Sequence, residues 1–218
     1  DGDDKIFASL GDSETYSGGD GNDTVTFEKF TTAVSVTIGQ NSVSGSATGI
    51  DHLTISNDIE SLIGSSGNDV LTGGSGGGAL SGGAGNDVLT GGNGDDVLNG
   101  GAGDDIINGG AGADAMNGGG GNDTLSYEND ILGVNVTLHT KASADLSGGN
   151  ANGDTAIGFA NVIGGGASDT IDGSLDTAPN IIDGGAGQNV GDTLTGGDND
   201  TVSFASLEAG VGVTVTLN

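Results

Sequence analysis

The sequence contains no cysteine, no tryptophan and no arginine, and it has a single proline. Without cysteine, disulfides and thiolate zinc sites are excluded. Aromatic residues make up 3% of the chain whereas glycine accounts for 48 of 218 residues, so an ordinary globular core is not expected. No stretch is long and apolar enough for a membrane span, and we expect no membrane insertion.

Positive charge is also nearly absent. Three lysines stand against 31 acidic residues, giving a formal net charge of −28. This imbalance argues against nucleic acid as a partner and disfavours a compact state unless cations bind. Composition alone is typical of a disordered chain, and we interpret disorder as the metal-free state.

Glycine and aspartate recur every nine residues between residues 64 and 126. The units run GSSGNDVLT, GGSGGGALS, GGAGNDVLT, GGNGDDVLN, GGAGDDIIN, GGAGADAMN and GGGGNDTLS. Most have glycine at positions 1, 2 and 4, aspartate at position 6 and an aliphatic residue at position 8. A disordered linker has no reason to keep the hydrophobic column of Leu71, Leu80, Leu89, Leu98, Ile107, Met116 and Leu125. Each unit is therefore predicted to be a six-residue glycine loop followed by a three-residue strand.

Two units would form one turn of a flattened coil, which stacks same-side loops. One edge then aligns Asp69, Asp87, Asp105 and Asp123, and the other aligns Asp96 and Asp114. At a coil rise of roughly 4.8 Å and an effective dielectric constant near 20, neighbouring carboxylates repel by about 3 kcal/mol per pair. The block contains no lysine, arginine or histidine to offset this repulsion. Oxygen ligands alone favour calcium as the neutralising ion.

The block resembles the GGxGxDxUx nonapeptide of the RTX family, whose repeats form calcium-binding β-helices. The resemblance implies an all-β fold, a right-handed parallel β-roll, with each calcium ion between same-side loops of adjacent coils. In the family pattern one loop offers carbonyls at positions 2 and 4, the next offers carbonyls at positions 1 and 3, and both offer the aspartate. Gly78 departs from the pattern, so the site between it and Asp96 is expected to be weak or empty.

Carried over residue by residue, the resemblance implies several calcium sites. On the first edge, Ser65, Gly67 and Asp69 face Gly82, Ala84 and Asp87; Gly83, Gly85 and Asp87 face Gly100, Ala102 and Asp105; and Gly101, Gly103 and Asp105 face Gly118, Gly120 and Asp123. On the opposite edge, Gly92, Gly94 and Asp96 face Gly109, Ala111 and Asp114.

Acidic loops also occur outside the block. Asp4 and Asp23 are nineteen residues apart, so a calcium site between them requires a one-residue bulge. The Asp-rich start is not an EF-hand, because no glutamate follows at loop position 12. Asp169 could keep one weak site with Asn189, and an irregular loop is an equal alternative.

Asp58 and Glu60 flank an isoleucine. Acid pairs can serve glycoside hydrolysis, but the neighbouring residues offer no aromatic sugar platform, and we interpret the pair as a solvated loop. His52 and His139 are interpreted as surface residues. The glycine loops lack the Lys-Ser/Thr of a phosphate cradle, and no GxSxG elbow is present, so no enzymatic activity is expected.

A larger repeat appears when the sequence is shifted by one hundred residues. GGDGNDTVTFE at Gly18 matches GGGGNDTLSYE at Gly118, and the alternating Val34, Val36 and Ile38 match Val134, Val136 and Leu138. Such alternation predicts half-buried strands. We divide the chain into N-terminal RTX loops (1–26), a strand insert (27–63), the main block (64–126), a second strand insert (127–163), a degenerate block (164–203) and the start of a third insert (204–218). We interpret it as a window on a longer array.

Position 7 of the units is largely apolar as well. Its residues are Val70, Ala79, Val88, Val97, Ile106 and Ala115. Ordinary β-propensity accounts for such a column, and a docking stripe is the alternative.

The expected function is that of an extracellular, calcium-binding β-roll segment in a large secreted structural or adhesive surface protein of a Gram-negative bacterium. The RTX resemblance implies type I secretion, with folding when several calcium ions bind after export. Self-association and a cell-surface or polysaccharide partner are the expected interactions. The alternative is the noncatalytic roll of a calcium-dependent exoenzyme such as a protease, lipase or polysaccharide epimerase. Ice binding is disfavoured, because position 9 varies among Thr, Ser and Asn instead of forming a threonine ladder.

Overall fold

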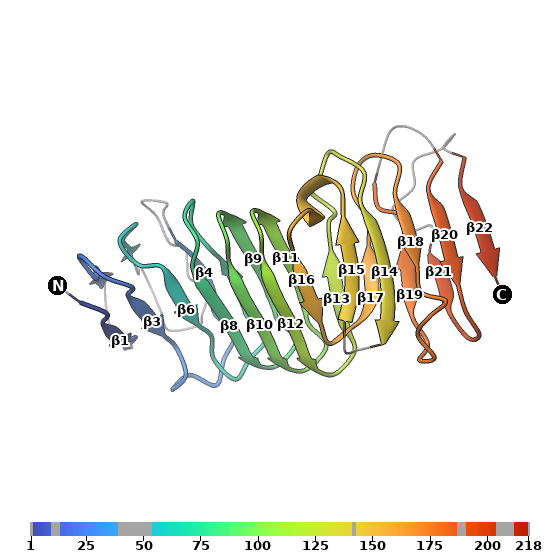
Figure 1. The fold of residues 1–218 in the computed structure, drawn as a ribbon. Helices are drawn as coiled ribbons and strands as arrows, with labels where there is room; N and C mark the ends of the chain where they lie inside the picture. The colour runs from blue at the N-terminus through green and yellow to red at the C-terminus, as the bar shows by residue number, and fades with distance from the viewer. Residues whose placement is uncertain are drawn as a thin grey trace.

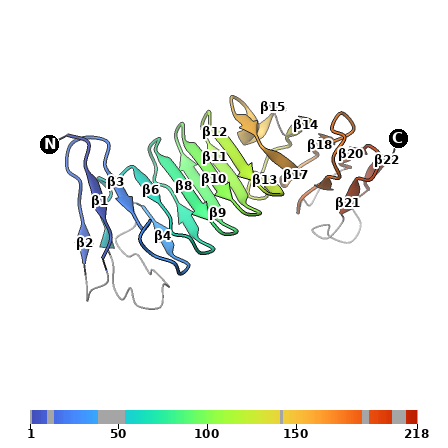
Figure 2. The ribbon, with the colours of Figure 1, turned by 90° about the horizontal axis from the view of Figure 1, so that it is seen from below.

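The computed structural model describes residues 2–9, 14–38, 54–140, 143–186, 191–203 and 212–217. Short strands stack into long sheets along one axis, with the two termini at opposite ends (Figure 1, Figure 2). The only helix among these residues is one 3-10 turn, η1 (Gly149–Ala151). The prediction of an all-β parallel β-roll is confirmed.

Three long sheets form the walls of the roll. Sheet 1 has the strand order β1 (Lys5–Phe7), β3 (Thr24–Thr26), β6 (Ser61–Ile63), β8 (Ala79–Ala84), β10 (Val97–Ala102), β12 (Ala115–Gly120) and β16 (Thr155–Ile157). Sheet 2 has the order β21 (Thr201–Ser203), β19 (Ile181–Asp183), β17 (Phe159–Ile163), β13 (Asp123–Ser126), β11 (Ile106–Ala111), β9 (Val88–Asn93), β7 (Val70–Thr72) and β4 (Ser35–Thr37). Sheet 3 has the order β15 (Ser143–Ser147), β14 (Asn135–Thr140), β18 (Thr170–Asp172), β20 (Thr193–Gly196) and β22 (Thr214–Leu217).

A small fourth sheet pairs β2 (Thr15–Tyr16) with β5 (Thr54–Ile55). Among the described strands every pairing is parallel except that of β14 with β15, which form a hairpin.

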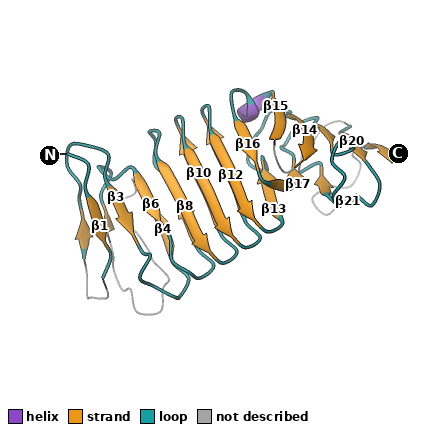
Figure 3. Cartoon of the chain, turned by 60° about the horizontal axis from the view of Figure 1, so that its bottom comes forward, coloured by secondary structure: helices purple, strands orange, loops and turns teal. Residues whose placement is uncertain are grey.

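The central block has the register that the nine-residue period predicts. Leu98 of β10 pairs with Leu80 of β8 on one side and with Met116 of β12 on the other. Figure 3 shows these three long strands side by side. All seven residues of the position 8 column are 3% exposed or less, and each such side chain contributes roughly 1.5–3 kcal/mol by leaving water. The column therefore forms the core of the roll, as predicted.

The central strands are longer than the sequence pattern indicated. Strands β8 to β12 each have six residues, covering positions 7 to 9 of one unit and positions 1 to 3 of the next. The prediction of a three-residue strand was wrong here because the glycine positions also pair between coils, as Gly83 does with Gly101. Only positions 4 to 6 remain for the turn.

Close stacking makes the position 2 glycines irreplaceable. Gly101 has a φ of +111°, and a Cβ added there would collide with the Gly83 carbonyl oxygen. We expect Gly101→Ala to destabilise the calcium-loaded roll by at least ~1–2 kcal/mol from backbone strain alone. Gly76→Ala is the matched control, because a Cβ there meets nothing within 4 Å. Urea unfolding in calcium measures both variants, and equal midpoints would contradict the expectation.

The hundred-residue repeat changes sheets from one copy to the next. Strands β3 and β4 of the first copy lie in sheets 1 and 2, whereas their counterparts β13 and β14 lie in sheets 2 and 3. This change of sheet occurs at two coils that are longer than the others, which we call the wide coils. Equivalent residues are 37 residues apart across the first wide coil and 40 apart across the second, whereas they are 18 apart in the main block. The segments 27–63 and 127–163 thus contribute strands to the roll itself, and residues 39–53 lie outside the described part.

Candidate metal sites at the edges of the roll

The position 6 aspartates form a hydrogen-bonded ladder along each edge. On the first edge, Oδ1 of Asp87 accepts the Asp69 N–H at 2.7 Å, and Asp105 and Asp123 continue the pattern at 2.8 and 2.9 Å. On the opposite edge, Oδ1 of Asp96 accepts the Gly78 N–H and Oδ1 of Asp114 accepts the Asp96 N–H, both at 2.8 Å. These acids are 3% exposed or less. The structure therefore aligns the acids that the sequence analysis aligned.

The second carboxylate oxygen of several of these acids has no hydrogen-bond donor. Oδ2 of Asp87, Asp96, Asp105 and Asp114 is buried without a partner in the described part of the chain. Leaving a buried charged group unpaired costs more than the ~1–3 kcal/mol of a neutral group. A bound cation is the natural partner for these oxygens.

Three of these oxygens, on Asp87, Asp96 and Asp105, lie next to a carbonyl oxygen of the next loop on their edge. A Cβ added at Gly82 would collide with both Asp87 Oδ2 and the Gly100 carbonyl oxygen, so the two oxygens border one point. Gly100 stands in the same relation to Asp105 Oδ2 and the Gly118 carbonyl. A cradle of carboxylate and carbonyl oxygens thus recurs between successive same-side loops, and we call each such space a step.

The other carbonyls implied as ligands lie in these stacked loops. The position 2 and 4 carbonyls, such as those of Ser65 and Gly67, lie against the α-carbons of the same positions one coil later. The position 3 carbonyls of Ala102, Ala111 and Gly120 each accept a backbone N–H from the preceding loop at 2.7–2.8 Å. A carbonyl oxygen has a second lone pair, so this hydrogen bond does not prevent metal ligation.

No group of three or more acidic or histidine side chains forms a metal site by itself among the described residues. An ion in a step would thus be held by two carboxylates and several carbonyls. Calcium takes six to eight oxygen ligands of this kind in flexible geometry, whereas magnesium demands a near-ideal octahedron. The oxygens at the steps fit calcium.

Two other ladder acids receive hydrogen bonds from the protein at both carboxylate oxygens. Oδ1 of Asp69 accepts the Val34 N–H and its Oδ2 accepts the Ser65 N–H, at 2.7 and 2.6 Å. Asp169 is bonded in the same way by the N–H groups of Val134 and Gly165. In the first site implied by the family pattern, between Asp69 and Asp87, the protein therefore already supplies donors to the first carboxylate.

In the degenerate regions, the hydrogen bonds of the ladder acids differ from those that the sequence predicts. The Asp169 N–H donates to Asp192 Oδ1 at 3.0 Å, so Asp192 takes the place proposed for Asn189, which lies outside the described residues. The Asp4 N–H donates to Asp23 Oδ1 at 2.8 Å, while β1 and β3 pair without a register shift. The expected bulge is absent from these paired strands because the extra residue lies outside them.

Four ladder acids were missed in the sequence, and one of them is Glu60, whose Oε2 accepts the Asp23 N–H at 2.8 Å. Oδ1 of Asp154, Asp192 and Asp200 accepts the N–H of the equivalent residue one coil earlier, at 2.9–3.1 Å. Each is followed two residues later by an apolar residue, as position 6 is followed by position 8. This local signal was present, but altered spacing of the preceding glycines concealed it.

Tyr127 donates a hydrogen bond to one of these ladder acids. Its hydroxyl donates to Asp154 Oδ2 at 3.1 Å, and the side chain is 1% exposed. Burial, followed by the nearby Asp154 charge, raises the pKa of the Tyr127 hydroxyl, so it remains protonated. One carboxylate oxygen at this end of the row thus has a protein donor.

We expect Tyr127→Phe to destabilise the calcium-loaded chain by about 1–3 kcal/mol, because Asp154 Oδ2 loses its donor in a buried place. Tyr16→Phe is the control, since the Tyr16 hydroxyl bonds to Glu14 and the Ser9 N–H near the surface. Thermal unfolding in saturating calcium measures both. Equal melting temperatures for the two variants would show that the Tyr127 hydroxyl is not needed.

Burial also raises the pKa of the edge carboxyls. The pKa of Asp87 rises to about 7 and that of Asp96 to about 6, chiefly through burial and further through neighbouring acids. An unfolded aspartate titrates near ~3.9, so the folded chain binds more protons than the unfolded chain from about pH 4 to 7. Without bound metal, stability must then fall as pH rises through this window.

With calcium chelated, we therefore expect more β signal in circular dichroism at about pH 5 than at about pH 7.5. With calcium present the sign should reverse, because protons compete with the ion for the carboxylates. A chelated chain that loses β signal on acidification would contradict the raised pKa values.

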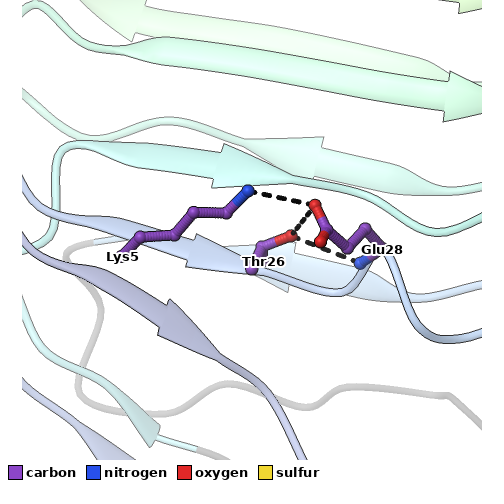
Figure 4. Close-up of polar contacts among 3 residues, drawn as sticks. All are labelled: Lys5, Thr26 and Glu28. Carbon is purple, nitrogen blue, oxygen red and sulfur yellow. Dashed lines mark hydrogen bonds and ion pairs between the residues drawn. The ribbon is translucent and has the colours of Figure 1, made fainter.

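The described lysines cannot neutralise the ladders. Lys5 binds Glu28 at 3.0 Å, and Glu28 also contacts Thr26 (Figure 4). Lys29 lies 4.3 Å from the ring centre of Phe7. The Lys5–Glu28 pair is about half exposed, and such surface pairs contribute only ~0–1 kcal/mol. Both cations lie at the N-terminal end, away from the main block.

The family comparison agrees with this geometry. The family model described as the RTX calcium-binding nonapeptide repeat (4 copies) matches residues 55–89, 73–107 and 90–125. No curated protein matches the chain. Among the described residues, no helix has the length and apolar character to cross a membrane. Residues 55–125 are therefore an array of RTX calcium-binding nonapeptide repeats, and they form a calcium-binding β-roll.

Proposed function

We propose that this chain is a calcium-stabilised structural segment of a secreted bacterial surface protein, which folds only after export. The observation that carries the proposal is the buried carboxylate oxygen without a donor at Asp87, Asp96, Asp105 and Asp114. A chain of net charge −28 with these oxygens turned inward requires cations for compaction.

Because folding is coupled to calcium binding, the chain folds only on the side of the membrane where calcium is high. Inside the cell, where free calcium is low, the acidic chain stays open. Outside the cell, sites of modest affinity fill at ~10⁻⁴ to 10⁻³ M, and binding free energy becomes folding free energy. The roll then assembles coil on coil, each coil stabilised by its neighbours.

The side chains on the outer faces of the sheets support a structural role. Their outer positions carry small and apolar side chains, among them Val97 and Ile106, which are 57% and 41% exposed. The sequence contains neither a GxSxG elbow nor the Lys-Ser/Thr of a phosphate cradle. We therefore propose a noncatalytic segment whose extended surface serves adhesion or assembly.

The test is the calcium midpoint of folding, followed by small-angle X-ray scattering at physiological ionic strength. We expect the radius of gyration to fall at ~10⁻⁴ to 10⁻³ M calcium and to stay large in the same concentration of magnesium. Folding at submicromolar calcium would overturn the export-coupled role, because the chain would then fold inside the cell. A catalytic activity in the intact secreted protein would favour the exoenzyme alternative.

A further inference from the structure

Asparagine precedes glycine at three equivalent places in the main block. In each pair the asparagine is at position 9 of one unit and the glycine is at position 1 of the next. The pairs are Asn99-Gly100 in β10, Asn108-Gly109 in β11 and Asn117-Gly118 in β12. We call them the three strand links. The position 9 side chain takes no part in the calcium steps.

An asparagine followed by glycine loses its side-chain amide slowly in water. The glycine nitrogen attacks the asparagine Cγ, so that an N–Cγ bond forms and the Cγ–Nδ2 bond breaks. Nδ2 leaves as ammonia and takes the proton of the glycine N–H. Water then opens the succinimide ring at one of its two carbonyls and gives aspartate or isoaspartate. Glycine favours the attack because it has no side chain and its backbone rotates most freely.

Strand geometry holds the two reacting groups of each link apart. A side chain in a strand stands roughly perpendicular to the sheet, whereas the next N–H lies in the sheet plane and points at a neighbouring strand. Position 1 N–H groups bond between coils in this way, and that of Gly64 donates to the Ser81 carbonyl at 2.8 Å. Gly73 and Thr90 form the same bond in sheet 2. Attack on the amide would require the strand to leave the sheet.

Packing leaves the glycines of the strand links no room to rotate. All three are buried, and a Cβ added at Gly100 would collide with the Gly118 carbonyl oxygen of the next coil. The dipeptide Asn152-Gly153 has the opposite environment, because both residues are exposed and lie in the turn between η1 and β16. One chain therefore contains the same dipeptide in a protected and in an open setting.

We propose that the three strand links are deamidation sites that are reactive in the metal-free chain and protected in the roll. The proposal rests on the calcium-dependent folding proposed above. Because the loss of ammonia is not reversed, these links limit how long a chain stays metal-free and still folds. The neighbouring units carry Thr72, Ser81 and Thr90 at position 9, whose hydroxyl side chains do not undergo this reaction.

Either product of the reaction opposes folding of the roll. Asn99 pairs with Ser81 on one side and with Asn117 on the other. Isoaspartate adds a methylene to the backbone, which breaks this in-register pairing. Aspartate in place of both Asn99 and Asn117 puts like charges directly opposite each other on neighbouring strands, which destabilises a sheet. Deamidated chains should therefore need more calcium to fold.

The test measures deamidation of the wild-type chain at mildly alkaline pH, in millimolar calcium and in excess chelator. Cleavage at aspartate followed by mass spectrometry puts each link in its own peptide, because Asp105 and Asp114 separate them. We expect all three links to react at least ~10-fold more slowly in calcium, since reaction then waits for local opening of the strands. Asn152 is the internal control and should react at least ~10-fold faster than Asn99 in calcium.

A refolding measurement tests the consequence. The triple variant Asn99→Ser, Asn108→Thr and Asn117→Ser carries the residues found at position 9 of Ser81 and Thr90, with which these strands pair. After equal times in chelator, the fraction of wild-type chains that regain β signal in calcium should decline, whereas the triple variant should keep its fraction. If the triple variant does not fold, Asn99→Ser alone should decline more slowly than wild type. Equal decline of the variant and wild type overturns the proposal.

Circular dichroism in chelator separates the two ways in which the experiment can fail. A chelated chain that keeps its β signal would overturn the proposed function, because folding would then not depend on calcium. A chain that unfolds in chelator, and whose three strand links nevertheless react at the same rate with and without calcium, would overturn the deamidation proposal alone.

Discussion

Removing calcium with excess chelator is expected to abolish most of the far-UV β signal of this chain, and millimolar calcium should restore it. Each ion at a hundredfold excess over its Kd stabilises the fold by about 2.7 kcal/mol. Typical domains are stable by only ~5–15 kcal/mol, so the loss of several ions exceeds the whole stability. Without the ions, adjacent buried carboxylates also repel by about 3 kcal/mol per pair.

Two controls separate ligation from simple screening. High sodium chloride screens exposed charges but reaches buried pairs poorly, so it should not replace calcium. Magnesium should also fail, because it demands a tighter octahedron and loses water reluctantly. A chelated chain that keeps its β signal, with no metal found by elemental analysis, would contradict the proposed role of calcium.

The main block could be predicted from sequence because a roll is stabilised by nearest neighbours. Each coil contacts only the coils above and below it, so a local period of nine residues determines the global register. The same period told which side chains face inward, as Leu98 does, and which acids share an edge, as Asp96 and Asp114 do. No long-range information was needed.

The wide coils could not be predicted because the period fails there. Glu60 reaches the ladder after 37 residues and Asp154 after 40, and neither spacing follows from the nonapeptide frame. Asp192 lies 23 residues beyond Asp169, whereas the sequence analysis paired Asp169 with Asn189, which is 20 residues beyond it. Where the number of residues per coil changes, the acid that pairs with a given ladder residue depends on the path of the coil through space. The exchange of sheets between the two copies has the same origin.

Asp105→Asn is expected to be the most damaging single carboxylate change. Asp105 borders two steps, since its Oδ1 accepts the Asp87 N–H and its Oδ2 faces the Gly118 carbonyl. Asparagine keeps one oxygen acceptor but removes the charge that binds the cation. Loss of up to two ions, at about 2.7 kcal/mol each under a hundredfold excess of calcium, should move the folding midpoint to higher calcium. Calcium titrations followed by circular dichroism measure the shift.

Asp104→Asn is the matched control, one residue away with the same change in charge. Asp104 is exposed, and its Oδ1 accepts the Asn122 N–H at 2.8 Å. Asn68 and Asn86 already fill this role at position 5 of other units, so the variant should stay within about 0.5 kcal/mol of wild type. In chelator the order of stability of the two variants should reverse. Asp105→Asn removes a carboxylate whose pKa is raised by burial and by Asp123, and this removal favours the metal-free fold. Equal shifts for the two variants in calcium would mean that net charge, and not ligation at the steps, drives the folding of the roll.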